Sequence, residues 1–167
     1  ILVRVKVMLK KIFLLIVSVC LLLLFLSPNL SFAVQERRIA LVIGNGAYQH
    51  SRLKNTANDA ADMSKVLTQL NFKVITRTDA TLKQMEESLD EFWSELKGGG
   101  VGLFYFAGHG LQVQGRNYLV PVDAKATVEQ DVKFECLDAG KVLGRMEAAE
   151  NELNIVFIDA CRNNPFD

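Results

Sequence analysis

Short apolar runs that alternate with segments of helical periodicity restrict the fold of this chain more than any other feature. Four such runs occupy residues 37–45, 72–79, 101–108 and 153–160. Largely apolar runs of this length are typical of strands that helices cover on both faces, as in parallel sheets. The pattern therefore predicts an α/β domain with a mainly parallel sheet and helices on both of its faces.

Three segments between these runs carry apolar residues three or four positions apart, which indicates helices. One follows Asn55, one begins after Thr81, and one surrounds Val142. Thr81 and Gln84 have the spacing of a capping box, so the second helix should begin there. Residues 117–123 come after the third apolar run and are interpreted as a hairpin return.

Composition and motifs exclude several functions. The chain has 167 residues, with 19 Lys and Arg against 19 Asp and Glu. Because no basic excess is present to neutralise phosphates, a nucleic-acid partner is not expected. Gly44-Asn45-Gly46 lacks the third glycine of a dinucleotide fingerprint, and the histidines and cysteines lack the close pairs that zinc sites favour. We therefore predict no cofactor and no metal site from these patterns.

The N-terminus resembles a secretory signal. Four basic residues precede an apolar stretch at residues 12–26, and the small-residue site Ser31-Phe32-Ala33 follows. This pattern predicts cleavage after residue 33 and a periplasmic or extracellular domain at residues 34–167. An uncleaved membrane anchor is the alternative, and it would be the only membrane contact expected. A start at Met8 would make residues 1–7 an artefact of start-site choice.

Two reactive side chains, His109 and Cys161, each follow an apolar run. The carboxyl ends of parallel strands share one edge of a sheet, so the two residues should meet there if their strands are neighbours. A nearby imidazole can convert a thiol to the nucleophilic thiolate, and the Gly110 N–H could bind an oxyanion. The simpler interpretation is a loop histidine and a buried structural thiol.

Five segments, in this order, resemble caspase-like cysteine peptidases, especially bacterial metacaspases (orthocaspases): ALVIGNGAY, LKNTANDA, YFAGHG, LVPVD and DACRNNPF. The caspase signature is Q-A-C-[RQG]-G, with its histidine about 50 residues upstream. Here Asp159 and Asn163 replace the Gln and the Gly around Cys161, and His109 lies 52 positions before that cysteine. These departures favour the metacaspase branch.

The resemblance implies a three-layer α/β/α caspase-like fold and a cysteine endopeptidase. Cys161 would be the nucleophile, His109 the general acid/base, and the N–H groups of Cys161 and Gly110 the oxyanion site. Asp59 and Asp159 match positions at which metacaspases hold a basic side chain before the cleaved bond. A protein or peptide cleaved after Arg or Lys would be the substrate. The simpler interpretations are stabilisation of a helix N-terminus by Asp59 and a hydrogen-bonded strand-end carboxylate at Asp159.

The sequence leaves alternatives for calcium binding, for catalytic activity and for the C-terminal part of the domain. Asp123 matches one acidic position of calcium-activated metacaspases, but paired aspartates that would complete a calcium site are not found in the sequence. A caspase-like interaction module without activity is the alternative function. Proteins of this type continue with further strands, so we expect a fragment that ends after the cysteine loop. Its exposed sheet edge would favour self-association.

Overall fold

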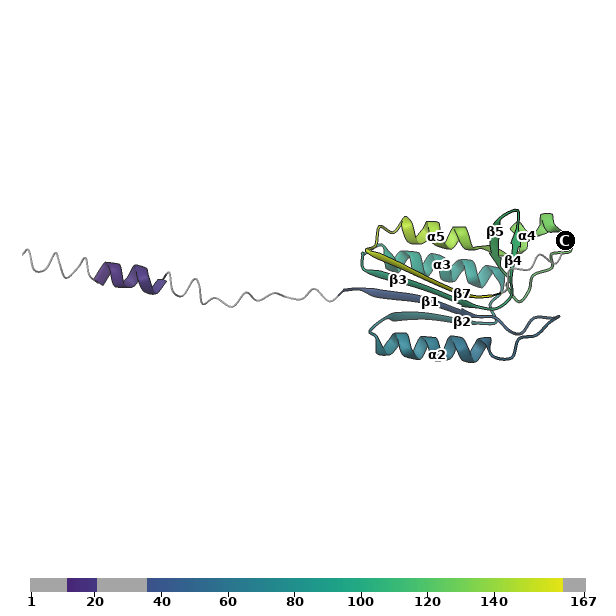
Figure 1. Ribbon diagram of the computed structural model, residues 1–167, viewed down its shortest axis with the longest axis horizontal. Coiled ribbons are helices and arrows are strands. Elements are labelled where there is room, and N and C mark those ends of the chain that lie inside the picture. The colour runs from purple at the N-terminus through teal and green to yellow at the C-terminus, as the bar shows by residue number, and fades with distance from the viewer. Residues whose placement is uncertain (1–11, 21–35, 161–167) are drawn as a thin grey trace, which may run out of the picture. The chain divides into compact units, whose positions relative to one another are not determined.

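The computed structural model describes residues 12–20 and 36–160 (Figure 1). Residues 12–20 are helical and belong to an N-terminal unit, whereas residue 36 begins the compact unit that contains the sheet. Within these two described ranges, none of the helices combines the length and the apolar character needed to cross a membrane.

The main sheet has four strands in the order β2-β1-β3-β7, and every neighbouring pair is parallel. The strands are β1 (Arg38–Gly44), β2 (Lys73–Thr78), β3 (Val101–Ala107) and β7 (Leu153–Asp159). Every residue of β3 is buried, and β1 is buried from its second residue onward. These two central strands are the most continuously apolar runs of the sequence, as burial on both faces requires.

Helices cover both faces of this sheet, which confirms the predicted α/β/α class (Figure 1). Helix α2 (Thr56–Gln69) packs on one face, while α3 (Leu82–Leu96) and α5 (Ala139–Glu147) pack on the other. The capping box of α3 is present as predicted: the Thr81 side chain accepts from the Gln84 N–H, and the Gln84 side chain accepts from the Thr81 N–H.

A second, antiparallel sheet was not predicted. Its strands are β4 (Gly110–Val113), β5 (Arg116–Leu119) and β6 (Leu137–Asp138), and η1 (Glu129–Asp131) and α4 (Val132–Glu135) precede β6. The expected hairpin return exists, but β5 pairs with β4 rather than with a strand of the main sheet. Gln114 and Gly115 form the turn with φ values of 49° and 77°, as a two-residue hairpin of the right twist requires.

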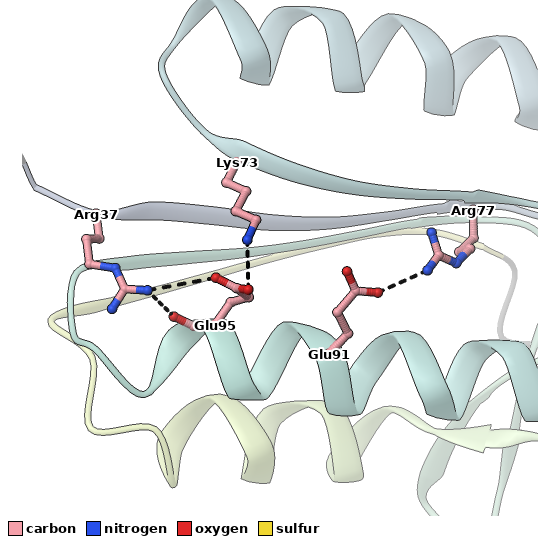
Figure 2. A network of polar contacts seen from close by, with 5 residues as sticks. All are labelled: Arg37, Lys73, Arg77, Glu91 and Glu95. Atoms are coloured by element: carbon pink, nitrogen blue, oxygen red, sulfur yellow. Dashed lines mark hydrogen bonds and ion pairs between the residues drawn. The ribbon is translucent and has the colours of Figure 1, made fainter.

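Exposed ion pairs join α3 to β2 and to the residue before β1 (Figure 2). Lys73 Nζ lies 2.7 Å from Glu95 Oε1, and Arg77 Nη2 lies 3.0 Å from Glu91 Oε2. Arg37 donates to the Glu95 carbonyl oxygen at 2.8 Å. Pairs as exposed as these contribute little individually, so the apolar core rather than this network holds α3 in place.

Strand β7 forms one edge of the main sheet within the described part of the chain. Its apolar side chains are unusually exposed: Leu153 and Phe157 are each 51% accessible, and Ile158 is 42% accessible. An edge strand with unpaired backbone groups and exposed apolar residues is a surface on which another strand can add.

Candidate active site

The strand that precedes His109 and the strand that leads to Cys161 are neighbours. Each β3 residue pairs with the β7 residue 52 positions later, ending with Ala107 opposite Asp159. The Gly108 N–H donates to the Asp159 carbonyl oxygen at 3.2 Å and extends the contact beyond the strand. The separation of His109 and Cys161 in the sequence equals this register offset. Cys161 itself lies outside the described residues, one position after Ala160.

Tyr48 fixes the backbone of His109. The His109 N–H donates to the Tyr48 hydroxyl at 2.9 Å, and that hydroxyl donates to the Val120 carbonyl oxygen at 3.1 Å. The rings of Tyr48 and His109 lie 4.4 Å apart, tilted by 46°. A Cβ at Gly108 would approach the Tyr48 hydroxyl to 2.7 Å, so only glycine permits this contact without rearrangement. Burial raises the pKa of Tyr48 to about 12, which keeps the hydroxyl protonated.

A backbone carbonyl orients the imidazole of His109. Nε2 lies 2.6 Å from the carbonyl oxygen of Ser51, which can only accept a hydrogen bond. The proton of the neutral ring is therefore assigned to Nε2, and Nδ1 keeps the lone pair that a general base needs. Ser51 has a φ of 57°, in the left-handed region that non-glycine residues rarely adopt. Such strain is typical of sites where the backbone must present a group in one direction.

The Gly110 N–H is free of the β4–β5 ladder. The Val120 N–H donates to the His109 carbonyl oxygen at 2.9 Å, which makes Gly110 and Leu119 a non-hydrogen-bonded pair. In such a pair the N–H of each residue points away from the partner strand. Among the described residues, the Gly110 N–H, immediately after His109, thus has no partner in this ladder and can donate to a ligand.

Three predicted site residues meet at one open pocket of about 460 Å³. Asp59 from the first turn of α2, Asp159 from the end of β7 and His109 all line it. Both carboxylates also act on Tyr105 of β3: burial is the main cause of its raised pKa, and the charges of Asp159 and Asp59 add to it. The carboxyl edge of the sheet therefore carries the His109 imidazole and two carboxylates, one from a helix and one from a strand.

Asp123 and Cys136 stabilise the fold through a hydrogen bond and through packing, respectively. Asp123 Oδ1 accepts from the Leu82 N–H at 2.9 Å, which satisfies a donor in the first turn of α3. Across residues 12–20 and 36–160, no three His, Cys, Asp or Glu side chains are grouped as metal ligands would be. Cys136 is a buried free thiol packed against Val113 and Tyr118, and burial raises its pKa to about 12.

Three further residues build this site and were not predicted from the sequence: Tyr48, Ser51 and Asn45. Asn45 is completely buried, and its side chain accepts from the Ala80 N–H at 2.8 Å and donates to the Val120 carbonyl oxygen at 3.2 Å. It thereby ties the loop after β1 to the loops after β2 and β5. Asn45 and Tyr48 lie in the segment GNGAY that carried part of the resemblance, which was the available signal.

Comparisons with known proteins agree with this architecture. The family model described as the caspase domain matches residues 37–167. Human mucosa-associated lymphoid tissue lymphoma translocation protein 1 is 37% identical over 132 residues, which cover 78% of this chain and 16% of that protein. Caspase-1 of the cat is 26% identical over 140 residues, which cover 78% of this chain and 33% of caspase-1.

Among solved structures, the Drosophila initiator caspase Dronc has a similar fold. Its TM-score is 0.59 at 15% sequence identity, with 74% of this chain and 48% of that chain covered. The fold therefore defines a caspase-like α/β/α domain. The match to the family model shows that the chain belongs to the caspase domain family, a family of cysteine peptidases. The chain spans about a sixth of the human relative, and the metacaspase branch stays a prediction.

Proposed function

We propose that this domain is a cysteine endopeptidase that uses His109 and Cys161 and cleaves after Arg or Lys. The observation that carries the proposal is the single pocket lined by His109, Asp59 and Asp159, at the end of the strand that leads to Cys161. The equality between the β3–β7 register offset and the His109–Cys161 spacing supports the pairing of the two catalytic residues.

In this proposal, His109 Nδ1 accepts the proton of the Cys161 thiol, and the sulfur attacks the carbonyl carbon of the substrate. The N–H groups of Gly110 and Cys161 stabilise the oxyanion of the tetrahedral intermediate. The C–N bond then breaks, and His109 donates the proton to the leaving amine. A water molecule, deprotonated by the same imidazole, hydrolyses the thioester and restores the thiol. The Ser51 carbonyl oxygen keeps Nε2–H in place throughout and stabilises the imidazolium.

The two carboxylates favour a basic side chain at P1, the residue before the cleaved bond. A guanidinium or an ammonium in the pocket would pair with Asp59 and Asp159, whereas an acidic side chain would be repelled by both. Asp159 is exposed and Asp59 is partly buried; β7 and α2 each bring one carboxylate to the pocket.

A panel of fluorogenic peptides that differ only at P1 tests the proposal. We expect Arg and Lys peptides to be cleaved and Asp peptides not to be. Cys161→Ala and His109→Ala should each abolish cleavage while the circular dichroism spectrum and thermal unfolding stay those of the wild type. Cleavage of the Asp peptide in preference to Arg, or wild-type turnover by folded Cys161→Ala, would contradict it.

The exposed edge of β7 favours a second function, association with another chain. Phe157 and Ile158 present apolar side chains at the edge of the sheet that, within residues 36–160, no other strand pairs with. We propose that two copies associate along this strand, with or without catalysis. Sedimentation over a range of concentrations should show dimers that Phe157→Lys disrupts. Equal sedimentation of both proteins would argue against this function.

Export of the domain is also proposed, from the basic and apolar pattern that precedes residue 34. A peptidase of this kind would act on proteins outside the cytoplasm, with no nucleic-acid partner. N-terminal sequencing of the protein isolated from an exporting host should give Val34. Retention of the residues before it in all of the isolated protein would contradict cleavage.

A further inference from the structure

A second pocket, of about 550 Å³, lies on the other side of His109. Its volume falls within the range of pockets that enclose small ligands, about 300–1,000 Å³. Among the described residues, His109 is the only one that lines both this pocket and the acidic one. The imidazole of His109 is therefore shared by two pockets, one that contains two carboxylates and one that contains none within residues 36–160.

The walls of the second pocket are mainly apolar. They are formed by the loop after β1, the start of β4 and the segment after β5, through the side chains of Tyr48, Leu111, Val120, Pro121, Val122 and Ala124. In the described part of the chain, no Asp, Glu, Lys or Arg lines this pocket. Gln49, His50 and Ser51 add polar groups to the wall beside His109 and Gly110. Because the larger part of the wall is apolar, a large apolar side chain buries more surface here than a polar or charged one.

The backbone behind this wall is already paired. The Val120 carbonyl oxygen accepts from both Asn45 and Tyr48, and the Val120 N–H donates to His109. The Val122 N–H donates to the Ala80 carbonyl oxygen at 3.1 Å. Because these backbone groups are paired, this part of the wall offers side-chain surface rather than free backbone groups to a ligand.

From this arrangement we propose that the second pocket binds the residues after the cleaved bond, P1′ and P2′, and selects large apolar side chains there. The inference rests on the proposed peptidase function. If a basic P1 side chain fills the acidic pocket and the scissile bond lies at His109, the chain beyond that bond continues on the other side of the imidazole. That side also holds the leaving amine, to which His109 must deliver a proton. Gly110, the proposed oxyanion donor, lines the same pocket.

Internally quenched peptides in a two-by-two design test the inference on the full chain. P1 is Arg or Asp, and the two residues after the bond are Leu-Leu or Gly-Gly. We expect kcat/KM for Arg followed by Leu-Leu to exceed that for Arg followed by Gly-Gly about tenfold or more, as apolar pockets discriminate. Cleavage after Arg at equal rates overturns this inference alone, whereas absence of cleavage after Arg overturns the proposed function and this inference with it.

Variants at the wall make the test specific. Val122→Lys should lower the ratio of Leu-Leu to Asp-Asp cleavage after Arg at least tenfold, because a positive charge now faces the pocket. Val122→Ala, a milder change, should lower the ratio of Leu-Leu to Gly-Gly. The matched control is Val128→Lys, since Val128 is 48% exposed and does not line the pocket; both ratios should stay those of the wild type. Ratios unchanged in the folded Val122 variants would overturn the proposal.

Discussion

The hydroxyl of Tyr48 accepts the backbone N–H of His109 at 2.9 Å, and the two rings are 4.4 Å apart. A residue of the loop after β1 thus holds both the main chain and the ring of a residue after β3. The same hydroxyl donates to Val120, the residue that follows β5. One buried oxygen therefore joins three loops at the carboxyl edge of the sheet.

Removing that oxygen should impair catalysis without changing the proposed chemistry. Tyr48→Phe leaves the His109 N–H and the Val120 carbonyl oxygen without this partner. We expect it to lower kcat about tenfold and to destabilise the fold by about 1–3 kcal/mol, the usual cost of an unsatisfied buried group. The measurements are turnover of an Arg peptide and urea unfolding.

Tyr118→Phe is the matched control for Tyr48→Phe. Tyr118 is buried to a similar degree, but its hydroxyl makes no hydrogen bond within residues 36–160. Its loss should change both quantities little. Equal effects of the two substitutions would show that the hydroxyl of Tyr48 has no special role.

Asn45 should be among the most sensitive polar positions for stability. Asn45→Ala removes the acceptor of the Ala80 N–H and one donor to the Val120 carbonyl oxygen, at a completely buried position. We expect a loss of about 3 kcal/mol, from more than one unsatisfied group and a small cavity. Chemical unfolding measures it, and Asn117→Ala, which removes only an exposed 3.3 Å hydrogen bond from Gln112, should cost much less. Similar losses at the two sites would contradict this account.

The carboxylates of Asp59 and Asp159 should affect the preference for a basic P1 side chain rather than the stability of the fold. Asp159→Asn keeps the shape of the side chain but removes its charge, so kcat/KM for an Arg peptide should fall about tenfold or more, while a peptide with an uncharged P1 should be affected less. Asp62→Asn is the control, because Asp62 is exposed on α2 and does not line the pocket. An Asp159→Asn variant that retains the wild-type preference for Arg would exclude the carboxylate from P1 recognition.

The sequence predicted the main sheet because its strands and helices are long enough to carry a periodic pattern. It also predicted that His109 would lie at the carboxyl edge of this sheet, since the ends of parallel strands share that edge, while the resemblance pointed to Asp59 and Asp159. The second sheet escaped prediction because β6 has two residues and β4 and β5 four each, too few for alternation to be recognised. Ser51 acts through a carbonyl oxygen that every residue has, so no side-chain pattern could reveal it.

The buried thiol of Cys136 should make stability depend on pH in the alkaline range. Burial raises its pKa from the ordinary value of 9.0 to about 12, so the folded state keeps the proton where the unfolded state loses it. The stabilising contribution is complete below pH 9 and is lost as the pH rises from there towards 12. At pH 10 the free energy of unfolding should be lower by about 1.4 kcal/mol than at pH 8, from this group alone.

Urea unfolding between pH 8 and pH 10 measures this effect, in a Cys161→Ala background that removes the proposed nucleophile. Cys136→Ala in the same background is the control: it should be less stable at pH 8, because a cavity replaces the sulfur, yet its stability should fall less with pH. Tyr48, whose pKa burial raises from 10.0 to about 12, adds to the fall near pH 10 in both proteins, so the difference between the two slopes is the quantity that reports on Cys136. If both proteins lose stability with the same slope, then another group titrates in this range and the Cys136 thiol does not.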